Sequence, residues 1–337
     1  MHAQKFQAPS GARGALSRAR RHAWARAFAL SLLAAAVACG DASSDGPLVV
    51  FNAGSLARPL RAALDSFAER EGVDVAQESA GSLESARKLT ELGKIPDLIA
   101  LADAAVFPGY LMPAHVDRYT EFARNRMVVA FTDSSRFADQ MVPGTWWQVL
   151  RREGVEVGRA DPQLDPNGYR TLMVWQLAEH YYRQPGLSAE LRERSPERNV
   201  RPKEADLVGL LQAGEFDYIW SYESMARAAG LRYVTLPADV DLSDPALADV
   251  YARASVNVRG ASVGDTVEFR GQPIVYAFAV PVNAPHRELG ERFAAFLLSD
   301  DGRAILRRAG LDALEEPVTR GASGDSTAAS ETESKAP

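Results

Sequence analysis

The stretch Leu48–Phe67, LVVFNAGSLARPLRAALDSF, decides the fold of this chain. Its apolar run Leu48–Phe51 is typical of a buried parallel strand. The small residues Ala53, Gly54 and Ser55 then allow a sharp turn, after which apolar residues recur at helical spacing. The N-terminus of such a helix directs free N–H groups and the positive end of its dipole toward the space above the strand. The stretch therefore predicts half of an anion-binding pocket.

A second copy of this unit follows in Val73–Leu92, VDVAQESAGSLESARKLTEL, where a strand again runs into the letters AGSL. If the two strands are parallel neighbours, Ser55 and Ser82 meet at one carboxyl edge of the sheet. Ligands of open α/β folds bind at such an edge. The alternative is that each serine only caps its helix.

Residues 1–38 predict a signal peptide. They hold six basic and no acidic residues, and they end in a short apolar run that fits an export signal better than a membrane anchor. The only cysteine, Cys39, follows this run and small residues, and so resembles the lipobox of bacterial lipoproteins, in which the thiol is acylated after cleavage. An ordinary signal peptide cut nearby is the alternative. Both predict export to the periplasm or the cell surface, with a lipid anchor at Cys39 in the first case.

The mature chain is acidic. The sequence has 38 Lys and Arg against 44 Asp and Glu, and removing the six basic residues of the leader leaves 32 against 44, a net charge of −12. This sign argues against nucleic acid or an anionic membrane surface as a partner. A single cysteine cannot form an intramolecular disulfide, so the core must hold the fold. Residues 39–46 read as the cysteine and a flexible tether, and 321–337 as a disordered tail.

Late elements predict that the chain returns to its first domain. The strand Pro273–Pro281 and the helix after it resemble elements of the first half. We therefore expect two lobes joined by two crossing strands, which form a hinge with the ligand cleft between the lobes. The expected ranges are 47–128 with 270–315 for lobe 1, 129–269 for lobe 2, and crossings near 126–132 and 262–275.

Three segments of the expected second lobe place polar residues at a helix start or strand end. Asp165 stands in LDPNGYR, Glu204 in RPKE, and Tyr222 at the end of the strand DYIWSY. Each has a simpler reading: Asp165 caps a helix, Glu204 is favoured in a first turn by the helix dipole, and Tyr222 packs. Whether the next residue, Glu223, assists a site stays open.

Taken in order, these motifs carry a resemblance to a known family. FNAGSL, ESAGSL, DPNGYR, RPKE and a tyrosine eighteen residues beyond that glutamate resemble the substrate-binding proteins of tungstate/molybdate ABC transporters, in particular the archaeal type. The resemblance covers about Leu48 to Leu311. It implies the α/β type II periplasmic-binding-protein fold. It also implies that the oxyanion is bound by Gly54, Ser55, Ser82, Asp165, Glu204 and Tyr222.

The sequence departs from the family pattern in three ways. Asn167 replaces a frequent cysteine, the segment between the DPNGYR and RPKE motifs is short, and WSYES stands where the family often has FEYRS. The preference between tungstate and molybdate therefore stays open.

Two carboxylates beside a dianion repel it unless something compensates. Hexavalent tungsten and molybdenum are large, hard Lewis acids that take more than four oxygens, so Asp165 and Glu204 can become ligands to the metal of the bound oxyanion. Sulfate and phosphate cannot expand in this way, so the same pair would repel them.

The sequence thus predicts an exported binding protein that delivers tungstate or molybdate to an ABC permease and its ATPase. We expect a monomer with no cofactor besides the bound substrate. A binder of another anion or of ferric iron on the same fold is an alternative, and an exported serine hydrolase is a second. Against an enzyme, none of the five histidines lies in the candidate motifs, so neither serine has a base beside it in sequence.

Overall fold

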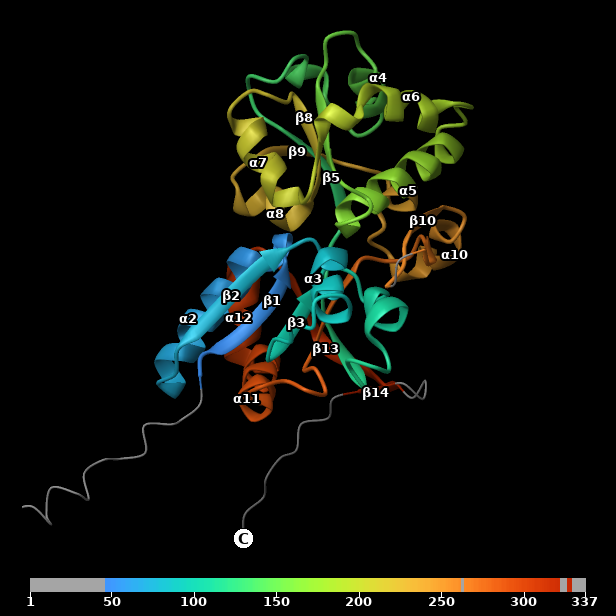
Figure 1. Ribbon diagram of the computed structural model, residues 1–337. Helices are drawn as coiled ribbons and strands as arrows, with labels where there is room; N and C mark the ends of the chain where they lie inside the picture. The colour runs from blue at the N-terminus through green and yellow to red at the C-terminus, as the bar shows by residue number, and fades with distance from the viewer. Residues whose placement is uncertain (1–45, 262–263, 322–325, 329–337) are drawn as a thin grey trace, which may run out of the picture. The chain divides into compact units, whose positions relative to one another are not determined.

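The computed structural model describes residues 46–261, 264–321 and 326–328 (Figure 1). The expected signal peptide, Cys39 and the tether up to residue 45 lie outside the described residues, as does most of the expected tail. The described chain is an α/β protein with two mixed sheets and one separate hairpin. In this part of the chain, no helix combines the length and the apolar character needed to cross a bilayer.

The seven-stranded sheet carries both serine turns, and we call it and its helices the first lobe. Its strands, in spatial order, are β14 (Ser326–Ala328), β13 (Asp312–Gly321), β4 (Arg118–Arg124), β12 (Val275–Ala279), β3 (Leu98–Leu101), β1 (Leu48–Ala53) and β2 (Val75–Ala80). The two strands that precede the serine turns, β1 and β2, are parallel neighbours, whereas β12 runs antiparallel to β3 and β4. The late strand therefore does return to the first sheet, as the sequence predicts.

The helices of the first lobe pack through aromatic side chains. They are α2 (Ala57–Glu71), α3 (Ser82–Thr90), α11 (Arg287–Leu298) and α12 (Asp300–Arg308), with the short helices η2 (Gly54–Leu56) and η3 (Phe107–Leu111). Pro59 is tolerated in the first turn of α2, and Gly72 ends this helix in the left-handed conformation with φ 67°. Phe67 of α2 contacts Phe293 of α11 at a ring distance of 5.2 Å. This packing holds α2 in place behind the first serine turn.

The five-stranded sheet and its helices form what we call the second lobe. The strands, in spatial order, are β7 (Val200–Arg201), β6 (Val157–Ala160), β8 (Tyr218–Tyr222), β5 (Met127–Phe131) and β9 (Arg232–Thr235). The helices are α4 (Trp146–Leu150), α5 (Pro166–Tyr181), α6 (Leu187–Arg194), α7 (Glu204–Gln212) and α8 (Glu223–Ala228), with η4 (Ala138–Gln140) and η5 (Glu197–Asn199). Trp220 is fully buried between Trp146 and Trp175. These three indoles form the centre of the second lobe.

The chain crosses between the two sheets at Asn125 and Arg126, which link β4 to β5. It returns through α9 (Ala238–Asp241), η6 (Pro245–Leu247), α10 (Ala248–Tyr251) and the antiparallel hairpin of β10 (Ser255–Arg259) and β11 (Thr266–Arg270). The lobe boundaries expected from the sequence stay a prediction. In the segment expected to be a disordered tail, β14 pairs with β13, so the structure differs there for residues 326–328.

Candidate functional site

The two serine turns lie side by side at one edge of the first-lobe sheet. Strands β1 and β2 pair in parallel with Ala53 opposite Ala80, which confirms the predicted adjacency. Ser55 lies in η2 and Ser82 begins α3, and both are buried. Neither serine is the capping residue of its helix, so the simpler capping interpretation is wrong for both.

Each serine hydroxyl already accepts a hydrogen bond from inside the first lobe. The backbone N–H of Ala102 donates to Ser82 Oγ at 3.0 Å, and the hydroxyl of Tyr276 donates to Ser55 Oγ at 3.2 Å. A serine hydroxyl has only one proton. Because these two are used as acceptors by the protein, their own protons are left for a further acceptor. The pair is therefore suited to donate to the oxygens of an anion.

The two candidate carboxylates meet at the N-termini of α5 and α7. Asp165 caps α5, with Oδ1 accepting from the N–H of Asn167 at 2.9 Å, while its Oδ2 accepts from the N–H of Glu204 at 3.1 Å. Glu204 Oε1 accepts from Ser221 Oγ at 2.7 Å and from the N–H of Tyr222 at 2.6 Å. Glu204 Oε2 is buried without a hydrogen-bond partner among the described residues. Asp165 thus does cap its helix, and Glu204 keeps one oxygen for another group.

Burial raises the pKa of both carboxyl groups. Loss of hydration raises the pKa of Asp165 to about 6. Burial, and then the negative charge of Asp165, raise the pKa of Glu204 to about 8. With the lobes in contact, the Glu204 carboxyl therefore holds a proton at neutral pH.

Tyr222 is buried beside this pair and is held by Arg170. The Nη1 atom of Arg170 donates to Tyr222 Oη at 2.9 Å and to the carbonyl of Ala102 at 2.7 Å. Its Nη2 atom lies 3.0 Å from Asp103 Oδ2. Ala102 and Asp103 follow β3 of the first lobe, so Arg170 connects the two lobes. Because the Tyr222 hydroxyl accepts from Arg170, its proton is also left for another acceptor.

The N-terminus of α3 differs from the expectation in one respect. We expected its first N–H groups to be free to bind an anion. The N–H groups of Leu83 and Glu84 instead donate to the carbonyl of Leu164, at 3.1 and 3.3 Å. Leu164 precedes Asp165 in the second lobe. With the lobes in contact, a carbonyl therefore occupies these two donors, and the expectation is wrong for them.

Two glycines of the serine turns lie directly against the second lobe. A Cβ atom on Gly81 would lie 2.2 Å from the carbonyl oxygen of Leu164. A Cβ atom on Gly54 would lie 3.5 Å from the Cβ of Ala205, an ordinary contact distance. Gly81, next to Ser82, therefore lies against Leu164, which precedes Asp165. Gly54, next to Ser55, lies against Ala205, which follows Glu204. This seam between the lobes is the candidate site.

The structure brings all six predicted residues to the seam, and their contact with a ligand stays a prediction. Three further residues there were missed: Arg170, Asp103 and Tyr276. Arg170 is the last letter of the DPNGYR motif, and this position was the available signal. For Asp103 and Tyr276 the sequence offers none, because their partners are remote in the chain.

The sequence also contains one match to the GxSxG motif of serine hydrolases. The letters GASVG at 260–264 match GxSxG. Their ends, Gly260 and Gly264, lie between the antiparallel strands β10 and β11, whereas a hydrolase nucleophile stands in a strand-to-helix turn. Ser262 itself lies outside the described residues. The motif does not have the setting of a nucleophile elbow.

The α/β fold thus places hydroxyl donors of one sheet and carboxylates of the other at one seam, an arrangement that suits a small-molecule ligand. The chain belongs to the family described as bacterial extracellular solute-binding protein, which matches residues 48–312. This is a family of binding proteins, not of enzymes, so the hydrolase alternative is wrong.

Two relatives show the likeness along most of the chain. An uncharacterised solute-binding protein of Petrotoga mobilis is 41% identical over 273 residues, which cover 81% of this chain and 85% of the relative. The molybdate/tungstate-binding protein WtpA of Pyrococcus abyssi is 38% identical over 301 residues, covering 81% of this chain and 86% of the relative. The family resemblance found in the motifs is confirmed.

Solved structures show the same fold. The periplasmic molybdate-binding protein of Azotobacter vinelandii matches with a TM-score of 0.54 at 18% identity, covering 78% of this chain and 98% of that one. The sulfate-binding protein SubI of Mycobacterium tuberculosis matches with a TM-score of 0.57 at 15% identity, covering 80% and 88%. The predicted type II periplasmic-binding-protein fold is confirmed.

Proposed function

We propose that this protein captures tungstate or molybdate between its lobes. The observation that carries the proposal is the division of chemistry across the seam. On one side, the hydroxyls of Ser55 and Ser82 accept hydrogen bonds from the protein and keep their protons to donate. On the other side, Asp165 stands beside Glu204, which has an oxygen without a partner in the described chain. The name of the Pyrococcus abyssi relative points to the same ligands.

The carboxylates are the reason to prefer these anions over sulfate. Beside a dianion that cannot accept their oxygens, the ionised Asp165 costs several kcal/mol of repulsion, and Glu204 keeps its proton and binds no central atom. A tungsten or molybdenum centre accepts carboxylate oxygens as ligands, so the same two acids stabilise the bound ion. The oxo groups take hydrogen bonds from the serines and Tyr222. Selectivity then follows from the coordination number of the central atom.

The proposal extends to the role in the cell. The exported chain delivers the oxyanion, as a monomer, to the permease of an ABC transporter driven by its ATPase.

A lipid on Cys39 holds the protein at the outer face of the membrane. Cys39→Ala then abolishes incorporation of a clickable fatty acid into the protein in growing cells. An equally labelled variant would contradict the anchor without touching the binding proposal.

Titration calorimetry of the metal-free protein tests the binding proposal. The panel is tungstate, molybdate, sulfate, hydrogen phosphate and ferric citrate. We expect tungstate and molybdate to bind at least about a hundredfold more tightly than sulfate, since the carboxylate pair separates them by several kcal/mol. Sulfate binding as tight as tungstate binding would refute the proposal, and tight binding of ferric iron alone would favour the alternative ligand.

A further inference from the structure

Tyr276 is a buried tyrosine behind Ser55, and the proposed function gives Tyr276 no role. It lies in β12, and its side chain is inaccessible to solvent. Its hydroxyl donates to Ser55 Oγ at 3.2 Å and accepts from Asn125 Nδ2 at 2.8 Å. Its ring packs edge-on against the ring of Tyr222, with 5.9 Å between the centroids. It therefore touches two candidate ligand residues without being one.

The direction of these hydrogen bonds is fixed by Asn125. Its Oδ1 accepts from two backbone N–H groups, those of Arg126 at 3.0 Å and Ser224 at 3.3 Å. The amide nitrogen must therefore be the atom that faces Tyr276 Oη and Ser224 Oγ. An amide N–H only donates, so the single proton of Tyr276 is left for Ser55. Ser55 is consequently an acceptor on its inner side.

Asn125 stands where the chain crosses between the sheets. It follows β4 of the first lobe, and its partner Ser224 lies in α8 of the second lobe, two residues after Tyr222. One buried amide thus binds groups of both lobes and orients the tyrosine behind the serine.

We propose that Tyr276 is a positioning residue that makes Ser55 an obligate donor to the bound oxyanion, and that Asn125 sets the direction of this relay. The inference rests on the proposed function, because it assigns the Ser55 proton to that ligand. Without the Tyr276 hydroxyl, Ser55 Oγ has a vacant acceptor side, and its proton is free to point back into the lobe. Ser55 then loses the preorganisation that lets it donate without reorienting.

A double-mutant cycle tests the relay. The variants are Tyr276→Phe, Ser55→Ala and the pair of them, each titrated with molybdate in a calorimeter. We expect Ser55→Ala to weaken binding about tenfold or more and Tyr276→Phe to weaken it about three- to tenfold, since one hydrogen bond is lost or misdirected. The double variant is expected to bind like Ser55→Ala alone, because Tyr276 acts only through the serine.

Tyr251→Phe is the matched control, since Tyr251 is equally buried and donates to the carbonyl of Ala238 at 2.6 Å, away from the seam. It should keep the affinity of the unaltered protein. Two results would overturn the relay: unchanged binding by Tyr276→Phe, or an undiminished effect of that change in the Ser55→Ala background. Failure of the unaltered protein to bind molybdate or tungstate would instead refute the proposed function.

Discussion

At the scale of single residues, the chemistry of the site depends on which groups keep a proton to donate. Ser55, Ser82 and Tyr222 each accept one hydrogen bond from the protein and so have one proton to give. Glu204 has the opposite character, with an oxygen left over and a pKa raised to about 8. The two serine donors thus lie across the seam from Glu204, and Tyr222 lies beside Glu204 in the second lobe.

The raised pKa of Glu204 predicts a pH-dependent stability. The ordinary pKa of 4.5 applies to the unfolded chain and a pKa of about 8 to the folded one. The protonated side chain therefore favours folding in full below pH 4.5, and this contribution is lost as the pH rises through 8. Relative to Glu204→Gln, the unaltered protein should lose free energy of unfolding between pH 5 and 8.5, on the order of 3 kcal/mol.

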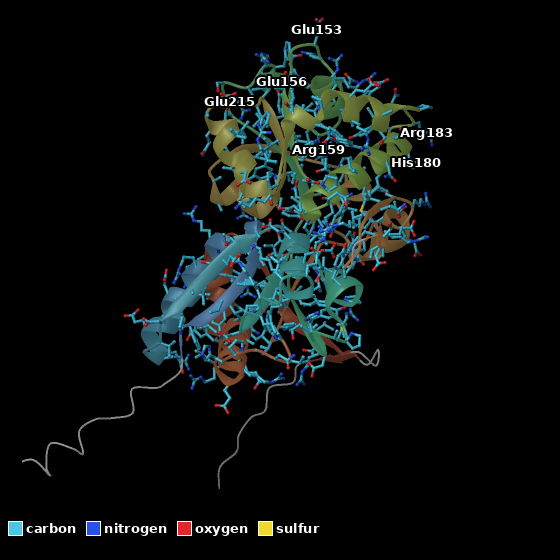
Figure 2. The ribbon with its side chains drawn as sticks, in the orientation of Figure 1. Glu153, Glu156, Arg159, His180, Arg183 and Glu215 are labelled. Atoms are coloured by element: carbon cyan, nitrogen blue, oxygen red, sulfur yellow. The ribbon has the colours of Figure 1, made fainter. Side chains whose placement is uncertain are left out.

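Urea unfolding of the ligand-free protein measures this difference across the pH range. Glu156→Gln is the control. A hydrogen bond from Asn199 lowers the pKa of Glu156, so its charge does not change between pH 5 and 8.5. It also lies at the end of the second lobe remote from the first lobe (Figure 2). Parallel stability curves for the unaltered protein and Glu204→Gln would contradict the assignment.

Asp165 predicts a loss of binding with the helix cap kept. In Asp165→Asn the side-chain oxygen still caps α5, but the charge that would bind the metal and the acceptor for the N–H of Glu204 are gone. We expect molybdate affinity to fall at least about tenfold, as for loss of a charged partner. Asp161→Asn is matched, because Asp161 caps the turn beside it through Gln163 N at 2.8 Å. Equal affinities of the two variants would remove Asp165 from the site.

At the scale of elements, the decisive feature is how closely the turn before α3 approaches the second lobe. Gly81 has φ −65° and ψ 150°, a conformation open to any residue. A glycine is needed here because a side chain has no space, and not because of backbone strain. The carbonyl of Leu164 takes the N–H groups of Leu83 and Glu84 through the gap that the missing side chain leaves.

Gly81→Ala should therefore hinder closure while the separate lobes stay intact. A Cβ atom 2.2 Å from the Leu164 oxygen cannot be accommodated without moving the lobes apart. We expect molybdate affinity to drop at least about tenfold, and the unfolding temperature of the ligand-free protein to fall by less than about 4 °C. Gly54→Ala, with its Cβ at 3.5 Å, should bind nearly normally. Unchanged affinity of Gly81→Ala would show that the lobes need not meet here.

Elements could be predicted from the sequence because their signals are local. The apolar run before the first AGSL, the recurrence of these letters and the helical spacing after each copy predict β1, α2, β2 and α3, and the parallel pairing follows from the repeat. The occupied N-terminus of α3 could not be predicted, because its partner Leu164 lies far away in the chain. Tyr276 is a further case: its continuous apolar strand indicates burial, but its hydrogen bond to Ser55 spans 221 residues.

At the scale of the whole molecule, a buried ion pair connects the lobes. Asp103 Oδ2 of the first lobe accepts from Tyr169 Oη at 2.5 Å and lies 3.0 Å from Arg170 Nη2, and all three side chains are buried. Arg170 also holds Tyr222. One arginine thus links lobe contact to a ligand residue.

Asp103→Asn should accordingly shorten the time that the ligand stays bound. The substitution removes the charge that Arg170 and Tyr169 share, and an uncompensated buried guanidinium favours separation of the lobes. We expect the dissociation rate of molybdate to rise about tenfold or more. Stopped-flow chase with excess tungstate measures this rate. Asp133→Asn, which breaks the exposed pair with Arg232 inside the second lobe, should leave the dissociation rate unchanged. Equal dissociation rates for Asp103→Asn and this control would refute the link.

The most direct measurement is X-ray absorption at the molybdenum K edge of the protein loaded with molybdate. If Asp165 and Glu204 bind the metal while the hydroxyls bind its oxo groups, the spectrum shows more than four oxygen neighbours, in a short and a longer shell. Four equal short bonds, as in free molybdate, would contradict the account.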